Sequence, residues 1–184
     1  MAFLVLLNGI PASGKSTVAR AWAERHAPDL PVAFDIDVLR AMIGGWRTAL
    51  RPAGEAARVM ATAAIGAHLR SGRDVIVPQY ARRADFVDDL AALATDSGAV
   101  FVELALRADA AEADRRFATR AAEGPSVHGD LGGDRMVDVH VGLEAFLATR
   151  TRVQRVGGPD QGVADVVDEI DAVLAAVAAG SVNG

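Results

Sequence analysis

The hydrophobic pattern divides the chain into short apolar runs and longer amphipathic segments. Continuous apolar runs are typical of strands buried on both faces of a parallel sheet, and we expect such strands at residues 3–7, 32–36, 74–78, 99–104 and 151–156. Apolar residues at helical spacing predict helices at about 15–26, 38–44, 53–70, 83–95, 110–123, 137–150 and 162–179. Strands that alternate with helices indicate βαβ units, and therefore a parallel sheet with helices on both faces.

The length of the chain, 184 residues, fits one domain of ordinary size, and we expect a single domain over residues 1–184. Residues 124–134 are rich in glycine and polar side chains and are the one internal stretch that looks detachable. We interpret them as the centre of a lid over about residues 121–137, which would close over a ligand and exclude water.

The loop after the first strand carries the clearest chemical signal. Gly9–Thr17 fits the pattern G-x-x-x-x-G-K-[ST] in full, directly after a predicted strand and at the start of a predicted helix. Such a loop cradles phosphates with backbone N–H groups and the positive end of the helix. The residues that we expect to contact ATP are Gly9, Ala12, Ser13, Gly14, Lys15, Ser16 and Thr17.

Two side chains of this loop have distinct predicted roles. Lys15 would reach the β- and γ-phosphates and act in catalysis, while the Ser16 hydroxyl would bind Mg²⁺. The predicted cofactors are therefore ATP and Mg²⁺. The alternative is a glycine turn that caps a helix, with Lys15 in solvent, but strand, spacing, lysine and hydroxyl would then have to coincide by chance.

The second strand ends in two carboxylates. In a parallel sheet, ligands bind beyond the carboxyl ends of the strands, so we expect Asp37 to act as the general base that takes a proton from an attacking hydroxyl. The alternative role for Asp37 is the N-cap of the following helix. Asp35 lies two residues earlier and can bind a substrate hydroxyl, or Mg²⁺ through water.

The third strand lacks the acidic residue with which a Walker B strand usually ends. Gln79 and Tyr80 stand there instead, at the ligand edge of the sheet, and we predict that both contact the substrate. The alternative is a loop pair with Tyr80 packed against the protein. Magnesium coordination would then rest on Ser16 and the phosphates, with Asp35 or Asp37 as a further candidate.

The helix before the proposed lid is rich in arginine. Arg116 and Arg120 are four residues apart and share a helix face, so they can clamp the phosphoryl group in transfer. Arg115 points off that face and should pair with a nearby carboxylate. The alternative is a solvated helix laced with salt bridges, since Glu112 and other acids lie close by.

The P-loop followed by Asp37-x-x-Arg40 resembles the small P-loop kinases, which include the kinase domain of polynucleotide kinases and the chloramphenicol phosphotransferases. In the first group a strand-end Asp-x-x-Arg supplies the base and a substrate-binding arginine, which implies these roles for Asp37 and Arg40. In the second group the base follows a strand end of the form Phe-x-x-Asp, and Phe34-x-x-Asp37 matches it.

The resemblance also implies a fold and an activity. Such kinases carry R-x-x-x-R at the start of a lid, as Arg116 and Arg120 do here. The fold is an α/β P-loop NTPase, a three-layer αβα sandwich with a parallel sheet in the order 2-3-1-4-5 and a lid. The activity is an ATP-dependent kinase that moves the γ-phosphate to a hydroxyl of a small molecule, such as an antibiotic, a sugar or a nucleoside.

Composition and missing motifs narrow the range of possible functions and partners. The net charge of −5 disfavours long nucleic acid as a partner, although a mononucleotide acceptor, and hence a nucleotide or polynucleotide 5′-kinase, stays open. A non-kinase ATPase or switch module is disfavoured, because the chain lacks a guanine-reading N-K-x-D and the Walker B acid of an AAA-type motor. The absence of cysteine and of any membrane-length apolar run suits a cytoplasmic protein.

Other arginines are candidates for recognising the acceptor. Arg47 and Arg51 follow the short helix, and Arg82 and Arg83 follow the third strand, so together they could recognise an anionic acceptor. A solvated surface explains each of them almost as well. The exit of the fifth strand, Arg155–Gly158, lies where P-loop kinases hold adenine through backbone contacts.

Overall fold

The computed structural model describes residues 1–122, 135–158 and 160–182, with 120–122 and 181–182 described by backbone only. Its sheet contains the parallel strands β1 (Ala2–Asn8), β2 (Val32–Ala33), β3 (Val75–Gln79), β4 (Ala99–Leu106) and β5 (Gln154–Val156), in the order β2-β3-β1-β4-β5. The helices are α1 (Lys15–Arg25), α2 (Ile36–Ala41), α3 (Leu50–Arg70), α4 (Ala84–Asp96), α5 (Ala110–Ala122), α6 (Met136–Leu147) and α7 (Val163–Val182). The predicted fold and strand order are confirmed.

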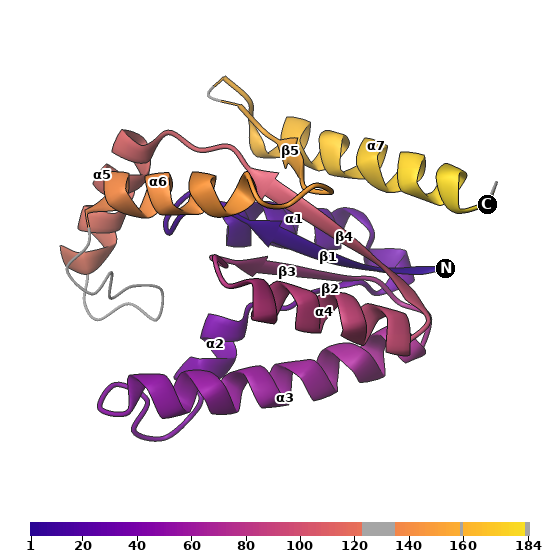
Figure 1. Ribbon diagram of the computed structural model, residues 1–184, viewed down its shortest axis with the longest axis horizontal. Helices are drawn as coiled ribbons and strands as arrows, with labels where there is room; N and C mark the ends of the chain where they lie inside the picture. The colour runs from indigo at the N-terminus through magenta and orange to yellow at the C-terminus, as the bar shows by residue number, and fades with distance from the viewer. Residues whose placement is uncertain (123–134, 159, 183–184) are drawn as a thin grey trace.

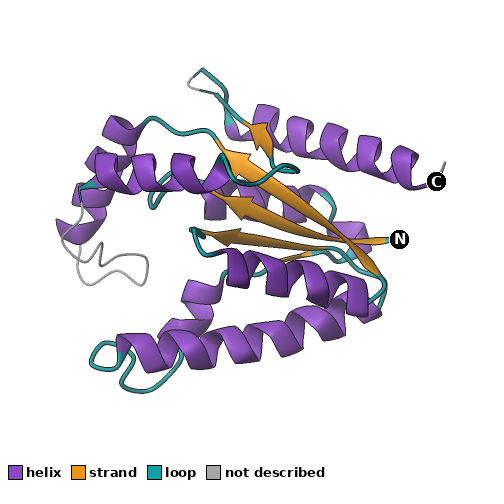
Figure 2. Cartoon of the chain, viewed as in Figure 1, coloured by secondary structure: helices purple, strands orange, loops and turns teal. Residues whose placement is uncertain are grey.

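Helices cover both faces of the sheet, as Figures 1 and 2 show. Alternate residues of β1 point to opposite faces: Leu4 and Leu6 pack with α3 and α4, whereas Val5 and Leu7 pack with α1 and α7. All four side chains are fully buried. The continuous apolar run of the sequence therefore reflects a central strand that is covered on both sides.

The second strand is shorter than its apolar run. The ladder with β3 continues only as far as the Phe34 N–H, which donates to the Ile76 carbonyl at 2.8 Å. The Asp35 side chain then accepts from the Asp37 amide at 3.1 Å and caps α2, so Ile36 begins a helix instead of extending the strand. Asp35, and not Asp37, is the N-cap.

Two further segments show local detail. Residues 151–153, expected in the fifth strand, form a turn and a short loop that precede β5. Asp109 caps α5, because its Oδ1 accepts from the Glu112 amide at 2.8 Å. The predicted lid centre, 124–134, lies outside the described residues, and α6 begins within the expected lid range at Met136.

The carboxyl ends of the strands share one edge of the sheet. In Figure 1 the strand arrows point to the side where α2 and α5 lie. The P-loop, α2, the β3–α4 connection and α5 all follow strands at this edge, which is where a doubly wound sheet binds ligands. Among the described residues, no helix is long and apolar enough to cross a membrane.

Candidate active site

The P-loop takes a tight turn that its two glycines permit. Gly14 has φ of 96° and precedes α1, so it occupies the left-handed region that glycine enters without strain. A Cβ on Gly9 would meet Ser13 Oγ at 3.2 Å and the Leu106 carbonyl oxygen at 3.4 Å. A side chain at this position would therefore crowd the close approach of the loop to the end of β4.

The Lys15 side chain folds back into the P-loop. Its ammonium group donates to the Ile10 carbonyl at 2.7 Å and is 3.4 Å from Ser13 Oγ, and the residue is only 8% exposed. A buried ammonium needs such oxygen partners. This contact supports the curled shape of the loop and leaves the charge beside the place where phosphates would bind.

Asn8 fixes the P-loop to the neighbouring strand exit, a role that the sequence did not reveal. Its fully buried amide Oδ1 accepts from the Gly9 N–H at 2.8 Å and from the Ala81 N–H at 2.9 Å. Its Nδ2 donates to the Ala81 carbonyl at 2.7 Å. The start of the P-loop and the segment after Gln79-Tyr80 are thereby held in one arrangement. An asparagine that ends an otherwise apolar strand was the available signal.

Ser16 and Asp35 meet across the sheet edge. The Ser16 hydroxyl donates to Asp35 Oδ2 at 2.8 Å, while Oδ1 of the same carboxylate caps α2 through the Asp37 amide. The proposed Mg²⁺-binding hydroxyl and the first turn of α2 are therefore linked by one side chain. Asp35 faces the P-loop, and Asp37 lies on the next stretch of chain, where it pairs with Arg40 at 3.3 Å.

A large cleft of about 1070 Å³ lies along the open side of the P-loop. Ala12, Ser13, Gly14 and Thr17 form its floor. Its far wall comes from Arg107, Gly157, Gly158 and Gln161, and Arg107 donates to the Gly157 carbonyl at 3.0 Å. The predicted adenine-side segment and the P-loop thus line one cleft, with a volume suited to a nucleotide.

The arginines of α5 stand at this cleft. Arg115 and Arg116 both line it and both pair with Glu112, with Arg116 Nε 2.9 Å from Glu112 Oε1. Hydrogen bonds from the two guanidinium groups hold the pKa of Glu112 below its ordinary value. The expected pairing of Arg115 is confirmed. The Arg120 side chain lies outside the described residues, and phosphate contact by Arg116 stays a prediction.

A second pocket, of about 420 Å³, is lined by α2, α3, the β3–α4 connection and α4. It brings together four predicted residues, Asp37, Arg40, Gln79 and Tyr80. The Gln79 Oε1 is buried and has no hydrogen-bond partner among the described residues. The sheet edge therefore carries one pocket along the P-loop and another around Asp37.

Trp46 supports Arg40 from behind. The Arg40 guanidinium lies 5.7 Å and the Arg47 guanidinium 4.6 Å from the centroid of its ring, and Trp46 is only 7% exposed. These distances are those of cation–π contacts. Trp46 is packed into the protein, and its contact helps to orient Arg40 next to Asp37.

The model of a known protein family matches more than half of the chain. The model of the AAA domain family (AAA_33) matches residues 4–140, which include the P-loop, Asp37 and the arginines of α5. No curated protein matches the chain.

Solved structures share the fold along most of the chain. A gluconokinase from Sinorhizobium meliloti 1021 is 22% identical, covers 97% of this chain and 94% of its own, and has a TM-score of 0.59. The tunicamycin resistance protein of Deinococcus radiodurans is 17% identical, with coverage of 95% and 96% and a TM-score of 0.63. A chain of the Pnkp1/Rnl/Hen1 RNA repair complex is 19% identical, with coverage of 82% and 46% and a TM-score of 0.63. At these identities the likeness shows the fold.

Proposed function

The chain belongs to the AAA domain family of P-loop proteins, and from this premise we propose that it is an ATP-dependent kinase that phosphorylates a hydroxyl of a small molecule. One observation carries the proposal: two pockets lie at the same sheet edge, and the Ser16–Asp35 contact connects the P-loop beside one of them to α2, which lines the other. One pocket has the phosphate cradle, and the other has a carboxylate suited to a base. The gluconokinase among the similar structures is consistent with such an activity.

The proposed reaction is a single in-line transfer. The acceptor hydroxyl oxygen forms a bond to the γ-phosphorus, the bond from that phosphorus to the β–γ bridging oxygen breaks, and ADP leaves. The hydroxyl proton passes to the Asp37 carboxylate. Because Arg40 pairs with Asp37 and also lies over the Trp46 ring, the carboxylate is held in one orientation.

Ser16 and Asp35 fit a magnesium site. A hydroxyl and a carboxylate 2.8 Å apart offer the oxygen ligands that Mg²⁺ prefers, and one or two protein ligands suffice when phosphates complete the shell. When bound, Mg²⁺ would neutralise charge on the phosphates. Asp35 thus takes the place of the acid missing from the end of β3, where Gln79 brings no charge.

The remaining charges act on the phosphates. Lys15 would exchange the Ile10 carbonyl for phosphate oxygens, and Arg116 would turn from Glu112 toward the γ-phosphate. Both side chains begin from contacts that hold their positive charge near the cleft without a ligand. Arg120 is proposed as the partner of Arg116 on the same helix face.

The test is acceptor-dependent ADP release. We would incubate the protein with ATP, Mg²⁺ and a panel of hydroxylated acceptors (alditols, aldonic acids, nucleosides, amino-glycosides) and identify the phosphorylated product by ³¹P NMR. A kinase should show slow hydrolysis alone and faster ADP release with an acceptor. Lys15→Met should abolish both reactions while the protein stays folded.

Two outcomes would contradict the proposal. Rapid ATP hydrolysis that no acceptor changes would indicate an ATPase or switch module. Unchanged turnover in Lys15→Met would remove the phosphate cradle from the mechanism. The matched control is Arg20→Met, which removes a positive charge from the exposed face of α1 and should leave turnover as it is.

A further inference from the structure

The pocket around Asp37 has an unusual charge balance for this protein. The whole chain carries a net charge of −5, yet four arginines line this pocket against three aspartates. The arginines are Arg40, Arg58, Arg82 and Arg83, and the aspartates are Asp37, Asp85 and Asp89. They come from α2, α3, the β3–α4 connection and α4, so the fold, and not one run of sequence, gathers them.

Two of these arginines are neutralised within the protein. Arg40 pairs with Asp37 at 3.3 Å. Arg83 donates to Asp85 from Nε and from Nη2 and lowers the pKa of that carboxyl, with a smaller contribution from Arg58. Neither of these two guanidinium groups is a source of uncompensated charge in the pocket.

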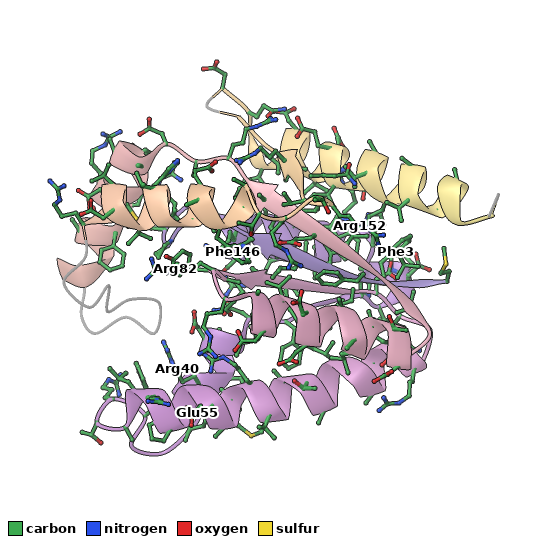
Figure 3. All side chains as sticks on the ribbon, viewed as in Figure 1. Phe3, Arg40, Glu55, Arg82, Phe146 and Arg152 are labelled. Atoms are coloured by element: carbon green, nitrogen blue, oxygen red, sulfur yellow. The ribbon has the colours of Figure 1, made fainter. Side chains whose placement is uncertain are left out.

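Arg58 and Arg82 differ from that pair. In the part of the chain that the structure describes, neither guanidinium lies within ion-pair distance of a carboxylate. Arg58 lies over the ring of Phe86, 6.0 Å from its centroid, which holds the side chain on the pocket wall. Figure 3 shows Arg82 beneath α6 and Arg40 on α2, both at the carboxyl edge of the sheet.

Gly142 of α6 leaves room for the Arg82 side chain. A Cβ at Gly142 would lie 2.8 Å from Nη1 of Arg82, closer than real contacts allow. The contact would be relieved by moving the arginine, since that atom is the end of a flexible side chain. Gly142 therefore sets where the Arg82 guanidinium can rest.

We propose that Arg58 and Arg82 form an anion subsite, so that the acceptor is a hydroxylated molecule with a carboxylate or phosphate group. This inference rests on the proposed kinase function and names the class of acceptor. Guanidinium groups bind carboxylate and phosphate oxygens with paired hydrogen bonds, and both groups satisfy the same geometry. The hydroxyl to be phosphorylated would lie at Asp37 and the anionic group across the pocket.

The test compares acceptors that differ only in charge. Aldonic acids are matched with the alditols of the same hydroxyl pattern, and sugar phosphates with the free sugars; kcat/KM is measured at saturating ATP and Mg²⁺. The anionic member of at least one pair should be preferred by about tenfold or more, the effect of one charge-assisted hydrogen bond. Arg58→Gln and Arg82→Gln should each lower that preference by about tenfold.

Two further variants test whether the preference for anionic acceptors depends on the number of arginines or on where the Arg82 guanidinium lies. Arg152→Gln removes an exposed arginine that does not line the pocket and should keep the preference. Gly142→Ala keeps every charge, favours helix formation in α6, and should lower the preference because it displaces the Arg82 guanidinium. Equal kcat/KM within all pairs, or a preference that both arginine variants retain, would overturn the inference.

A binding measurement distinguishes failure of the subsite from failure of the kinase proposal. If no acceptor is phosphorylated, titration calorimetry with the same aldonic acids and sugar phosphates still reports on the subsite. Binding that is lost in Arg58→Gln and Arg82→Gln but kept in Arg152→Gln would support the anion subsite and contradict the proposed kinase function. Absence of binding, or equal binding by all variants, would overturn the subsite.

Discussion

The Ser16 hydroxyl donates a hydrogen bond to Asp35 Oδ2 at 2.8 Å, and this contact joins the P-loop to the first turn of α2. Because Asp35 also caps α2, one carboxylate positions both the proposed magnesium ligand and the segment that carries Asp37. The two halves of the proposed reaction are thereby held in a fixed relation before any ligand binds.

Asp35→Asn separates the charge of this residue from its capping role. Asparagine caps helices as well as aspartate does, so the melting temperature should stay the same. The loss of negative charge beside Ser16 should raise the Mg²⁺ concentration needed for half-maximal activity by about tenfold or more. Activity measured across a Mg²⁺ titration checks this, and an unchanged titration would remove Asp35 from the metal site.

Asp35→Ala is the companion variant. It removes the cap together with the charge, and the free energy of unfolding should fall by about 1 kcal/mol, the usual effect of losing an N-cap. Urea denaturation of both variants measures the difference. Equal stability of the asparagine and alanine variants would mean that the capping contact contributes little to stability.

Asp37→Asn tests the base. The asparagine side chain cannot take a proton, so kcat should fall by about 10²- to 10⁴-fold, the usual contribution of a general base. The affinity for ATP, measured by calorimetry, should not change, because Asp37 lines the other pocket. A kcat close to that of the unmodified protein would assign the base to another residue.

Arg115 and Arg116 form a matched pair on α5. Both contact Glu112 and both line the nucleotide cleft, but only Arg116 shares a helix face with Arg120. Arg116→Gln should lower kcat by about 10²- to 10³-fold, as expected for loss of a donor to the transition state. Arg115→Gln should have a much smaller effect. Similar losses in both variants would indicate a general charge effect of the helix.

Asn8→Ala should destabilise the protein. It leaves the buried N–H groups of Gly9 and Ala81 and the Ala81 carbonyl without their side-chain partner, and the free energy of unfolding should fall by about 2–4 kcal/mol. Urea denaturation measures this loss. Affinity for ATP should fall as well, because the amide fixes the start of the P-loop. A variant as stable as the parent would show that the neighbouring backbone supplies other partners.

The carboxyl group of Asp74 should make the stability of the folded protein depend on pH. Burial raises the pKa of its carboxyl, and this effect outweighs the hydrogen bond from the Phe3 amide, which lowers it. The folded state therefore binds this proton more tightly than the unfolded state does. Asp74 therefore contributes stability to the folded state. This contribution is fully present below the pKa that the carboxyl has in the unfolded chain, and it is lost as the pH rises through the pKa of the folded state.

Asp74→Asn isolates this effect. Asparagine keeps an oxygen that can accept from the Phe3 amide but carries no charge. The variant and the parent should be equally stable in acid, and the variant should become the more stable one as the pH rises toward neutrality. Thermal unfolding over pH 3 to 8 checks this. A difference that is the same at every pH would contradict the raised pKa.

The sequence by itself determined the nature of the sheet and the phosphate cradle. Both depend on local chemistry: continuous apolar runs specify strands buried on both faces, and Gly9–Thr17 contains its own turn, charge and hydroxyl within one segment. The apolar run at 32–36 was nevertheless a poor guide to the end of β2, since the capping bond of Asp35 competes with strand pairing.

Only the tertiary structure decided which distant side chains share a pocket. The sequence named Asp35 and Asp37 but could not tell which would meet Ser16, because the chain leaves the strand and enters a helix between them, and the alternation of side chains holds only within a strand. It did not single out Asn8 or Arg58. Their partners lie on other strands and helices, so their roles exist only once the sheet brings those segments together.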